Sequence, residues 1–294
     1  MAKADIAALL AVAAALMIGI GDVLEQQSAQ LVTDKPVGTL ALFGRLLRDR
    51  RWWAGTLIAA AGFGLQAAAL GLGSVVLVQA LLVTSLLFAL VINVKVNHRR
   101  ITRWQGIWAA LLAAAVAVVV TVGNPQAGNP RGSFRTWAVV AVVMGTALIL
   151  CAIGARVFSS SVRALLLGLM SGSLWGLFSV LTKGVIDQLG RGIPTLLRMP
   201  ELYVWAVLAI AATALEQSAF RAGPLTASLP AVTISEPIVG SVLGVTVLGE
   251  TLNTNNIGLV ALGISVGVMI AATIALARSQ AASAIDDVPT AKVT

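Results

Sequence analysis

Nine long apolar stretches run along this sequence, and they constrain its fold more than any other feature. Each is close to the roughly 20 residues that a helix needs to cross the hydrocarbon core of a bilayer. The stretches cover residues 5–29, 52–71, 74–95, 103–122, 135–153, 161–183, 202–221, 225–248 and 256–278. We therefore predict an all-α, polytopic membrane helix bundle that forms a single integral membrane domain over residues 1–294.

The composition excludes the other broad classes of protein. Hydrophobic residues make up 58% of the chain, charged residues make up only 11%, and the mean hydropathy is +0.94. A soluble domain carries roughly 25% charged residues, so this chain could not cover a soluble surface, and a disordered or fibrous chain is equally excluded. The net charge of +8 lies in short loops between apolar spans. We therefore expect a lipid bilayer as the partner and no nucleic acid.

Lys and Arg residues are distributed unevenly between the two sides of the membrane. With nine spans, fourteen of the 20 Lys and Arg residues fall on one side and six on the other. Cytoplasmic loops carry the excess of positive charge. We predict a plasma-membrane protein with its N-terminus outside and its C-terminus in the cytoplasm.

The segment 35–48 is the main alternative in this topology. It is short and basic, so we interpret it as an amphipathic helix on the cytoplasmic leaflet, with its arginines near anionic lipid. If it crossed the membrane instead, the chain would have ten spans and its N-terminus would be inside.

The two halves of the chain resemble each other at a shift of 150 to 153 residues; for example, Gly19 matches Gly172 and Gly73 matches Gly223. Each copy holds four spans, and one additional span lies between them, so the second copy enters the membrane from the opposite side. Such an inverted repeat can open a central site to either face in turn, although duplication in a static membrane protein would leave the same pattern. The predicted organisation is a first repeat over 1–122, a linking helix and loops over 123–160, a second repeat over 161–278 and a disordered cytoplasmic tail over 279–294.

Glu236, in the middle of the eighth span, is the strongest candidate for a functional residue. Pro237 leaves the carbonyl of Thr233 without its helical donor. Pro230, seven residues earlier, does the same to the carbonyl of Thr226. We expect an interrupted helix with a carboxylate at the break, a typical midplane binding site, to which Thr233 and Ser235 contribute. The alternative is a packed kink in which Glu236 is neutral or paired with a Lys or Arg.

Polar side chains of other spans complete the candidate site. Charged groups inside a bilayer are costly and are therefore candidates for function, whereas amides more often form hydrogen bonds between helices. The predicted substrate-binding set is Asp22, Gln26, Gln66, Gln79, Trp175, Glu216, Gln217, Thr233, Ser235 and Glu236. Alternatively, Asp22 reaches cytoplasmic water, Glu216 pairs with Arg221, and Trp175 is ordinary packing.

Other residues are assigned structural roles. We expect Lys183 to anchor its span at the interface, with a bond to a carboxylate as the alternative, and Glu250 to be exposed in a loop. Glycines at four-residue spacing predict small faces where helices approach closely. These are Gly168, Gly172 and Gly176, the pair Gly240 and Gly244, and the pair Gly263 and Gly267.

Motifs for catalysis and for cofactors are missing. There is no Walker-type loop, no His-Glu-x-x-His and no Cys-x-x-Cys, and the chain has one histidine, His98, and one cysteine, Cys151. We predict that the protein is not an enzyme and has no cofactor, apart from a proton or Mg²⁺ as a transported or coupling ion. For Mg²⁺, a hard cation that prefers oxygen ligands, Asp22, Glu216 and Glu236 are the candidate ligands.

Two groups of motifs resemble a known superfamily. Ser235-Glu236-Pro237-Ile238-Val239-Gly240, Gly244, Leu248-Gly249-Glu250-Thr251-Leu252 and Gly258 resemble the signature of the drug/metabolite transporter superfamily with EamA-type repeats. The stretches Gly21–Ala29 and Glu216–Leu225 are similar to the NIPA-like magnesium transporter branch. The resemblance implies secondary transport of substrates such as amino acids, nucleosides, sugar derivatives and drugs. Members with EamA-type repeats usually have ten spans, one more than predicted here.

Three functions are compatible with these features. The first is a secondary transporter that moves a small polar or amphipathic solute by alternating access, with proton coupling through a carboxylate. The second is a transporter of Mg²⁺ or another divalent cation. The third is a lipid-carrier flippase or a non-transporting membrane subunit. A homodimer is left open in each case.

Overall fold

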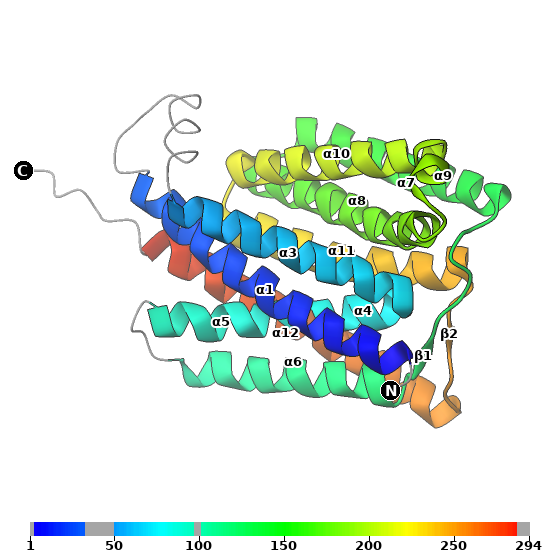
Figure 1. The fold of residues 1–294 in the computed structure, drawn as a ribbon. Coiled ribbons are helices and arrows are strands. Elements are labelled where there is room, and N and C mark those ends of the chain that lie inside the picture. Colours follow the sequence, from blue (N-terminus) through cyan, green and yellow to red (C-terminus); the bar gives the residue numbers. More distant parts are fainter. Residues whose placement is uncertain (1–2, 33–49, 97–100, 287–294) are drawn as a thin grey trace, which may run out of the picture.

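The computed structural model describes residues 3–32, 50–96 and 101–286. These residues form a helix bundle with one small strand pair (Figure 1). The helices are α1 (Lys3–Val32), α3 (Arg50–Leu72), α4 (Val75–Leu82), α5 (Ser85–Val96), α6 (Arg103–Thr121), α7 (Phe134–Val157), α8 (Ser160–Leu189), α9 (Ile193–Leu197), α10 (Pro200–Ala222), α11 (Leu225–Leu248) and α12 (Asn256–Asp286). The strands are β1 (Pro125–Gln126) and β2 (Thr251–Leu252), which pair antiparallel.

The predicted fold class is confirmed. The described part of the chain contains nine segments long and apolar enough to cross a membrane, with α4 and α5 counted as one segment, Val75–Lys95. Each segment coincides with one of the nine predicted stretches. The short helix α9 and the two strands were not predicted.

Helix ends agree with local sequence signals. Thr102 accepts a hydrogen bond from the backbone of Gln105, whose side chain bonds back to Thr102, so α6 begins with a capping box. Ser74 caps α4 through the backbone N–H of Leu77. Gly249 ends α11 in the left-handed region at φ +67°, a conformation that glycine adopts at little cost.

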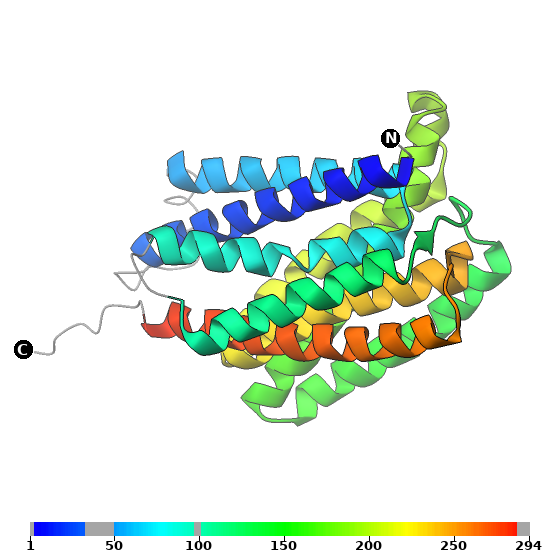
Figure 2. The same ribbon diagram turned by 90° about the horizontal axis from the view of Figure 1, so that it is seen from below.

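The bundle has two distinct ends, seen at opposite sides of Figures 1 and 2. At the end where α1 begins lie the α3–α4 turn, the strand pair and α9; we call this the N-terminal end. At the opposite end, which we call the C-terminal end, α12 finishes and the α7–α8 and α10–α11 connections lie. Helices α1 and α8, the first of each predicted repeat, therefore run in opposite directions. The segment 35–48 lies outside the described residues.

The position of the interrupted helix differs from the prediction. α11 is continuous from Leu225 to Leu248 although Pro230 and Pro237 lie inside it. The interruption occurs in the third span, between α4 and α5, where both the backbone N–H and the hydroxyl of Thr84 bond to the carbonyl of Leu81. The backbone N–H of Thr84 thus bonds to the carbonyl three residues earlier and not to the one four residues earlier, which marks the end of the regular α-helical pattern.

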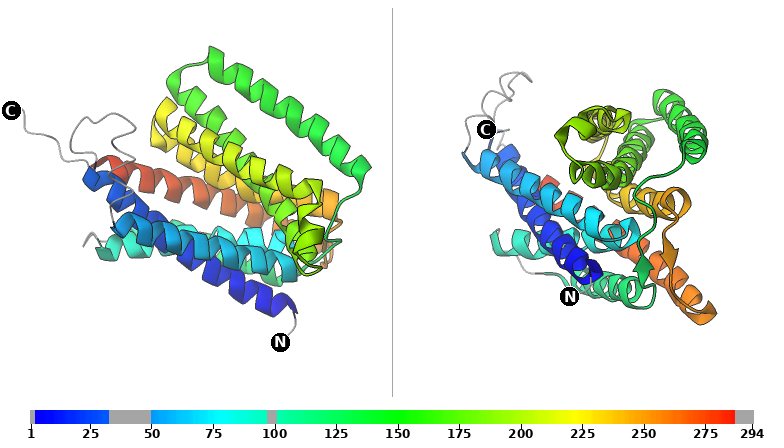
Figure 3. Two further views of the ribbon diagram at one scale, coloured as in Figure 1. Left: turned by 45° about the horizontal axis from the view of Figure 1, so that its top comes forward. Right: turned by 45° about the vertical axis from the view of Figure 1, so that its right-hand side comes forward.

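Helix α8 lies at the centre of the bundle and α7 at its edge. α8 packs along α10, α11, α3 and α7, and 56% of its span is buried. Only 6% of the α7 span is buried, and α7 stands apart from the remaining helices in the left view of Figure 3. α7 therefore presents most of its surface to lipid, while α8 carries side chains into the interior.

Glycines explain the close contact of α8 with α11. A Cβ at Gly168 would lie 2.9 Å from the carbonyl oxygen of Ser228, and one at Gly176 would lie 2.7 Å from that of Glu236. The predicted small face on α8 thus packs against α11. Gly263 and Gly267 differ, because a Cβ on either would meet nothing within 4 Å in the described part of the chain.

The predicted tail boundary at 279 is wrong for its first residues. α12 continues as a helix to Asp286, and residues 287–294 lie outside the described residues. The segment after 278 is rich in alanine, the residue with the highest helix propensity, and this accounts for the additional turns.

Candidate functional site

Glu236 lies halfway along α11 and inside the bundle. The side chain of Gln79 in α4 lies beside its carboxyl group, and Glu216 and Asp22 lie within electrostatic range. Together with Glu236, these neighbours come from four different helices, α11, α4, α10 and α1. Glu236 and Glu216 are half-buried, whereas Asp22 is exposed.

Gln79 is almost completely buried, with an exposed fraction of 1%. Its side chain packs on Gly240, where an added Cβ would lie 2.9 Å from Nε2. Nε2 has no hydrogen-bond partner that meets geometric limits. A buried amide donor without a well-formed bond is rare in proteins and marks a place where an acceptor on a water or a solute can complete the network.

Glu216 is held by an aromatic residue of the neighbouring helix. The Nε1 atom of Trp175 in α8 donates a hydrogen bond of 3.1 Å to its Oε2 atom. The Trp175 ring stacks on Phe63 of α3 at 5.9 Å and meets Phe178 edge-on at 5.3 Å. The aromatic side chains therefore connect the two predicted repeats next to the carboxylates.

Two predicted polar residues do not join this cluster, and a third cannot be placed. Gln217 is exposed on α10. Gln66 in α3 is buried and donates a hydrogen bond of 3.4 Å to Ser179 in α8, the interhelical role that is common for amides. Gln26 lies in α1, but its side chain is outside the described residues.

The hydroxyl groups near Glu236 bond to their own helix. Thr233 Oγ1 donates to the carbonyl of Leu229 at 2.8 Å, and Ser235 Oγ donates to that of Ala231 at 2.5 Å. Both side chains were predicted to contribute to the site. In this structure they satisfy backbone carbonyls within α11 instead.

The structure overturns the prediction for Glu250. Its side chain is completely buried, and it forms an ion pair of 2.9 Å with Lys183. Its two carboxylate oxygens also accept hydrogen bonds from the backbone N–H groups of Val75 at 2.7 Å and Val76 at 3.0 Å, which begin α4. Lys183 donates a further bond of 2.8 Å to the carbonyl of Gly73, so the alternative role considered for this lysine is the one observed.

Sequence reasoning missed this pairing because its partners are 67 residues apart. The chain reverses at Gly249 and turns Glu250 back towards the bundle. There the positive N-terminal end of α4 attracts its carboxylate. The Gly249-Glu250 pair directly after a span was the available signal.

Comparison with known proteins gives one clear relative. A curated protein of Corynebacterium glutamicum, described as an uncharacterized protein, is 37% identical over 280 residues, which are 93% of this chain and 95% of the relative. The chain belongs to the family of this corynebacterial protein. No family model matches the chain, and no solved structure matches it.

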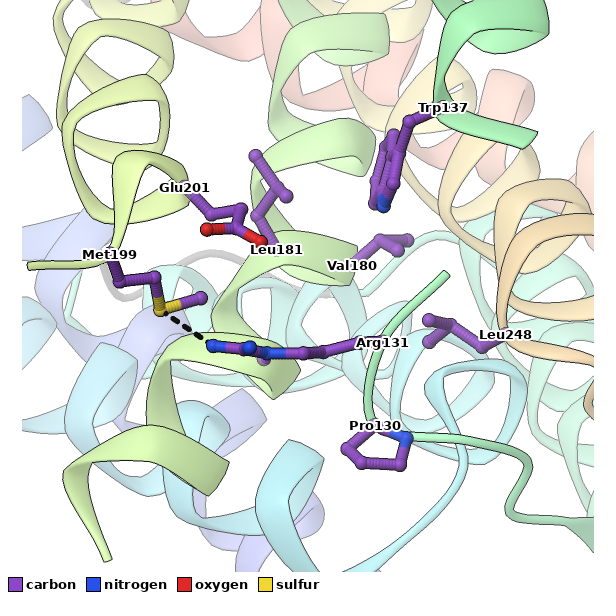
Figure 4. A pocket seen from close by; sticks show the side chains of 9 residues that line it. Pro130, Arg131, Trp137, Val180, Leu181, Met199, Glu201 and Leu248 are labelled. Carbon is purple, nitrogen blue, oxygen red and sulfur yellow. Dashed lines mark hydrogen bonds between the residues drawn. The ribbon is translucent and has the colours of Figure 1, made fainter. Parts of the chain in front are cut away.

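The most pronounced pockets in the described part of the chain are small and lie away from Glu236. One lies at the N-terminal end, between the 122–133 loop and helices α7, α8 and α10. Its lining includes Arg131 of the loop, Trp137 of α7, and Met199 and Glu201 at the start of α10 (Figure 4). The second lies between α11, α12 and Val83 and is lined mainly by apolar residues. Glu236 lines neither pocket, although Ile234 and Pro237, close to it in α11, line the second.

The described residues offer little support for a divalent-cation site. They contain no group of three or more His, Cys, Asp or Glu side chains close enough to hold a metal ion. Asp22, Glu216 and Glu236 are near enough to influence one another, but they do not form a compact ligand set.

Proposed function

We propose that this chain is a secondary transporter that moves a small polar or amphipathic solute across the plasma membrane by alternating access, with Glu236 at the centre of its site and a proton as the coupling ion. The C-terminus lies in the cytoplasm in this proposal. The proposal rests on Glu236, which is half-buried at the middle of α11, with the side chain of Gln79 beside it and Glu216 and Asp22 within electrostatic range.

The cost of burying acidic groups supports this proposal. Ionisable side chains within membrane helices are expensive, and they are usually retained where an ion or substrate passes. A bundle that served only as an anchor could place apolar residues at these positions. Glu236 can accept a proton or face a solute, and Gln79 offers an amide with unused bonding capacity.

The arrangement of the helices also favours transport. α1 and α8 run in opposite directions, as expected for the two copies of an inverted repeat, and the site is formed between the helices of the two copies. The resemblance of the motifs around Glu236 and Glu250 to the drug/metabolite transporter superfamily points to the same class of function. Mg²⁺ transport, suggested by the NIPA-like stretches, is less favoured because the acidic groups do not converge.

A non-transporting membrane subunit is the second candidate. Glu236 lines neither of the two small pockets described above, and this favours a subunit that binds no solute there. Under the transporter proposal, this conformation is one state of the cycle, and a solute enters after the helices separate.

Flux through the purified protein distinguishes the two candidates. Proteoliposomes are loaded with pyranine and challenged with one solute at a time: amino acids, nucleosides, hexose phosphates, tetraethylammonium or MgCl₂. The transporter proposal predicts an internal pH change for at least one solute, above that of protein-free vesicles. If no solute changes the signal of correctly folded protein, the subunit is the better interpretation. A dye for Mg²⁺ in the same vesicles tests the divalent cation directly.

A further inference from the structure

One face of α8 connects the candidate site with the N-terminal end of the bundle. Trp175, Ser179 and Lys183 are four residues apart, so they lie on successive turns of this face. Trp175 belongs to the acidic cluster, Ser179 accepts the bond from Gln66, and Lys183 pairs with Glu250. The ion pair therefore lies two helical turns from the site, on the way to the N-terminal end.

The same ion pair holds the two predicted repeats together. Lys183 and Glu250 belong to the second repeat, while the groups they bind, the carbonyl of Gly73 and the N–H groups of Val75 and Val76, belong to the first. Five polar groups thus meet in a region from which water is excluded.

The strand pair adds a cover over this contact. Asn253 donates from its backbone to the carbonyl of Gly123, and Asn129 donates to that of Leu248 at 2.7 Å. The hydroxyl of Ser74 lies 3.5 Å from the carbonyl oxygen of Pro125. The connection after α6 is therefore bound directly to the α11–α12 connection that carries Glu250.

The end of α3 lies close against α8 at this end of the bundle. A Cβ on Gly71 would lie 2.6 Å from a methyl carbon of Ile186 in α8. Towards the middle of the bundle, α3 and α8 stay in contact through the bond from Gln66 to Ser179 and the stacking of Phe63 on Trp175.

We propose that Lys183 and Glu250 form the gate that closes the N-terminal end of the transport path, and that the structure shows this gate closed. The inference rests on the proposed function. Opening requires Glu250 to leave Lys183 and the first N–H groups of α4, so that the α3–α4 turn and α8 move apart. Both charges regain water when they separate, which compensates for the lost ion pair and makes such a contact reversible.

The chain allows a direct test of side-specific access. Cys151 is its only cysteine, so C151A gives a cysteine-free background and S179C places one thiol between the site and the gate. Labelling by a methanethiosulfonate reagent that does not cross membranes is measured from each side in turn. K183M, which removes the ammonium group, is expected to raise the labelling rate from the N-terminal side about tenfold, which corresponds to about 1.4 kcal/mol, and to leave the rate from the other side unchanged.

Matched variants separate a gate from a general structural role. R191M breaks the ion pair of 3.1 Å between Arg191, just after the end of α8, and Asp187, one turn beyond Lys183, and is expected to leave labelling unchanged. K183R keeps the positive charge and is expected to keep the gate closed. Should K183M fail to fold, K183M/E250Q removes the buried lone charge and is expected to label rapidly from the N-terminal side.

Two results would overturn the gate. One is an unchanged rate from the N-terminal side in folded K183M or K183M/E250Q protein. The other is an equal rise from both sides, which indicates general loosening. Labelling needs no solute, so either result leaves the proposed function standing if pyranine flux is present. Side-specific labelling without any flux would instead contradict the transporter proposal, while the closed contact at the N-terminal end would still stand.

Discussion

Trp175 donates a hydrogen bond of 3.1 Å from its indole nitrogen to the carboxylate of Glu216, which lies 41 residues later on the neighbouring helix. The ring of Phe63 in α3 stacks on the ring of Trp175. A carboxylate at this depth is therefore oriented by a neutral donor and an aromatic surface. Glu216 in turn lies within electrostatic range of Glu236.

Replacing Trp175 by Phe is expected to weaken solute transport. W175F keeps an aromatic ring but removes the donor to Glu216, and a hydrogen bond to a charged group contributes about 1.5–3 kcal/mol. We expect the KM for the transported solute to rise about tenfold, measured by pyranine flux. W205F is the matched control, because it removes the indole bond of 2.8 Å to Thr182 and leaves Glu216 untouched. Equal effects of both variants would contradict a specific role for Trp175.

Replacing Gly172 by Ala is expected to destabilise the bundle. An added Cβ would meet the hydroxyl of Ser235 and the carbonyl of Val232, both on α11, so α8 and α11 must separate; overpacking of this kind costs about 1–3 kcal/mol. G263A is the control, since a Cβ there meets nothing within 4 Å and alanine favours a helix by up to about 1 kcal/mol. Thermal unfolding in detergent should show a lower Tm for G172A and no decrease for G263A.

Glu250 is expected to be more important for stability than a typical loop carboxylate. E250Q leaves the buried ammonium of Lys183 without a counter-charge, and loss of one partner from a buried pair costs about 3–5 kcal/mol. E201Q changes a carboxylate at the start of α10 that has no ion pair within the described residues, so it should stay within about 0.5 kcal/mol of the parent. Similar unfolding temperatures for both variants would show that the buried pair contributes little.

The predicted topology can be tested with reporters at the C-terminus. The excess of Lys and Arg on one side predicts that the end of α12 lies in the cytoplasm. A fluorescent-protein fusion to the C-terminus is expected to fluoresce, and an alkaline phosphatase fusion at the same point is expected to be inactive. The reverse pattern would invert the assignment of both ends.

Most of the fold was predictable because it depends on single helices. Each span is specified by about 20 apolar residues, and the boundaries follow local signals such as Ser74, Thr102 and Gly249. The break at Thr84 was not predictable in this way. The backbone N–H of Thr84 bonds to the carbonyl of Leu81, three residues earlier, and a hydropathy pattern does not reveal such a change.

The candidate site was predictable in part. Glu236, Gln79, Glu216 and Asp22 are polar groups in apolar spans, and the structure places them near one another. Gln66 and Ser235 have the same sequence signature, yet they bond elsewhere. Which polar residues converge depends on helix rotation, and that is set by packing between helices distant in sequence.

The buried position of Glu250 could not be predicted from a linear pattern. A charged residue after a span normally reaches water, and only the reversal at Gly249 together with the start of α4 provides an alternative partner. The prediction of an exposed Glu250 failed because it considered the local sequence alone.

The central claim is that Glu236 carries the coupling in a transport cycle, and the flux of E236Q tests it most directly. Proteoliposomes with parent protein, E236Q or the control E201Q are loaded with pyranine and given the solute that produces the largest signal with the parent. We expect E236Q to lose at least about 90% of the solute-induced pH change, which is a tenfold effect on the rate, while E201Q keeps it and both variants unfold at temperatures close to that of the parent. Flux through E236Q equal to that of the parent would contradict the account.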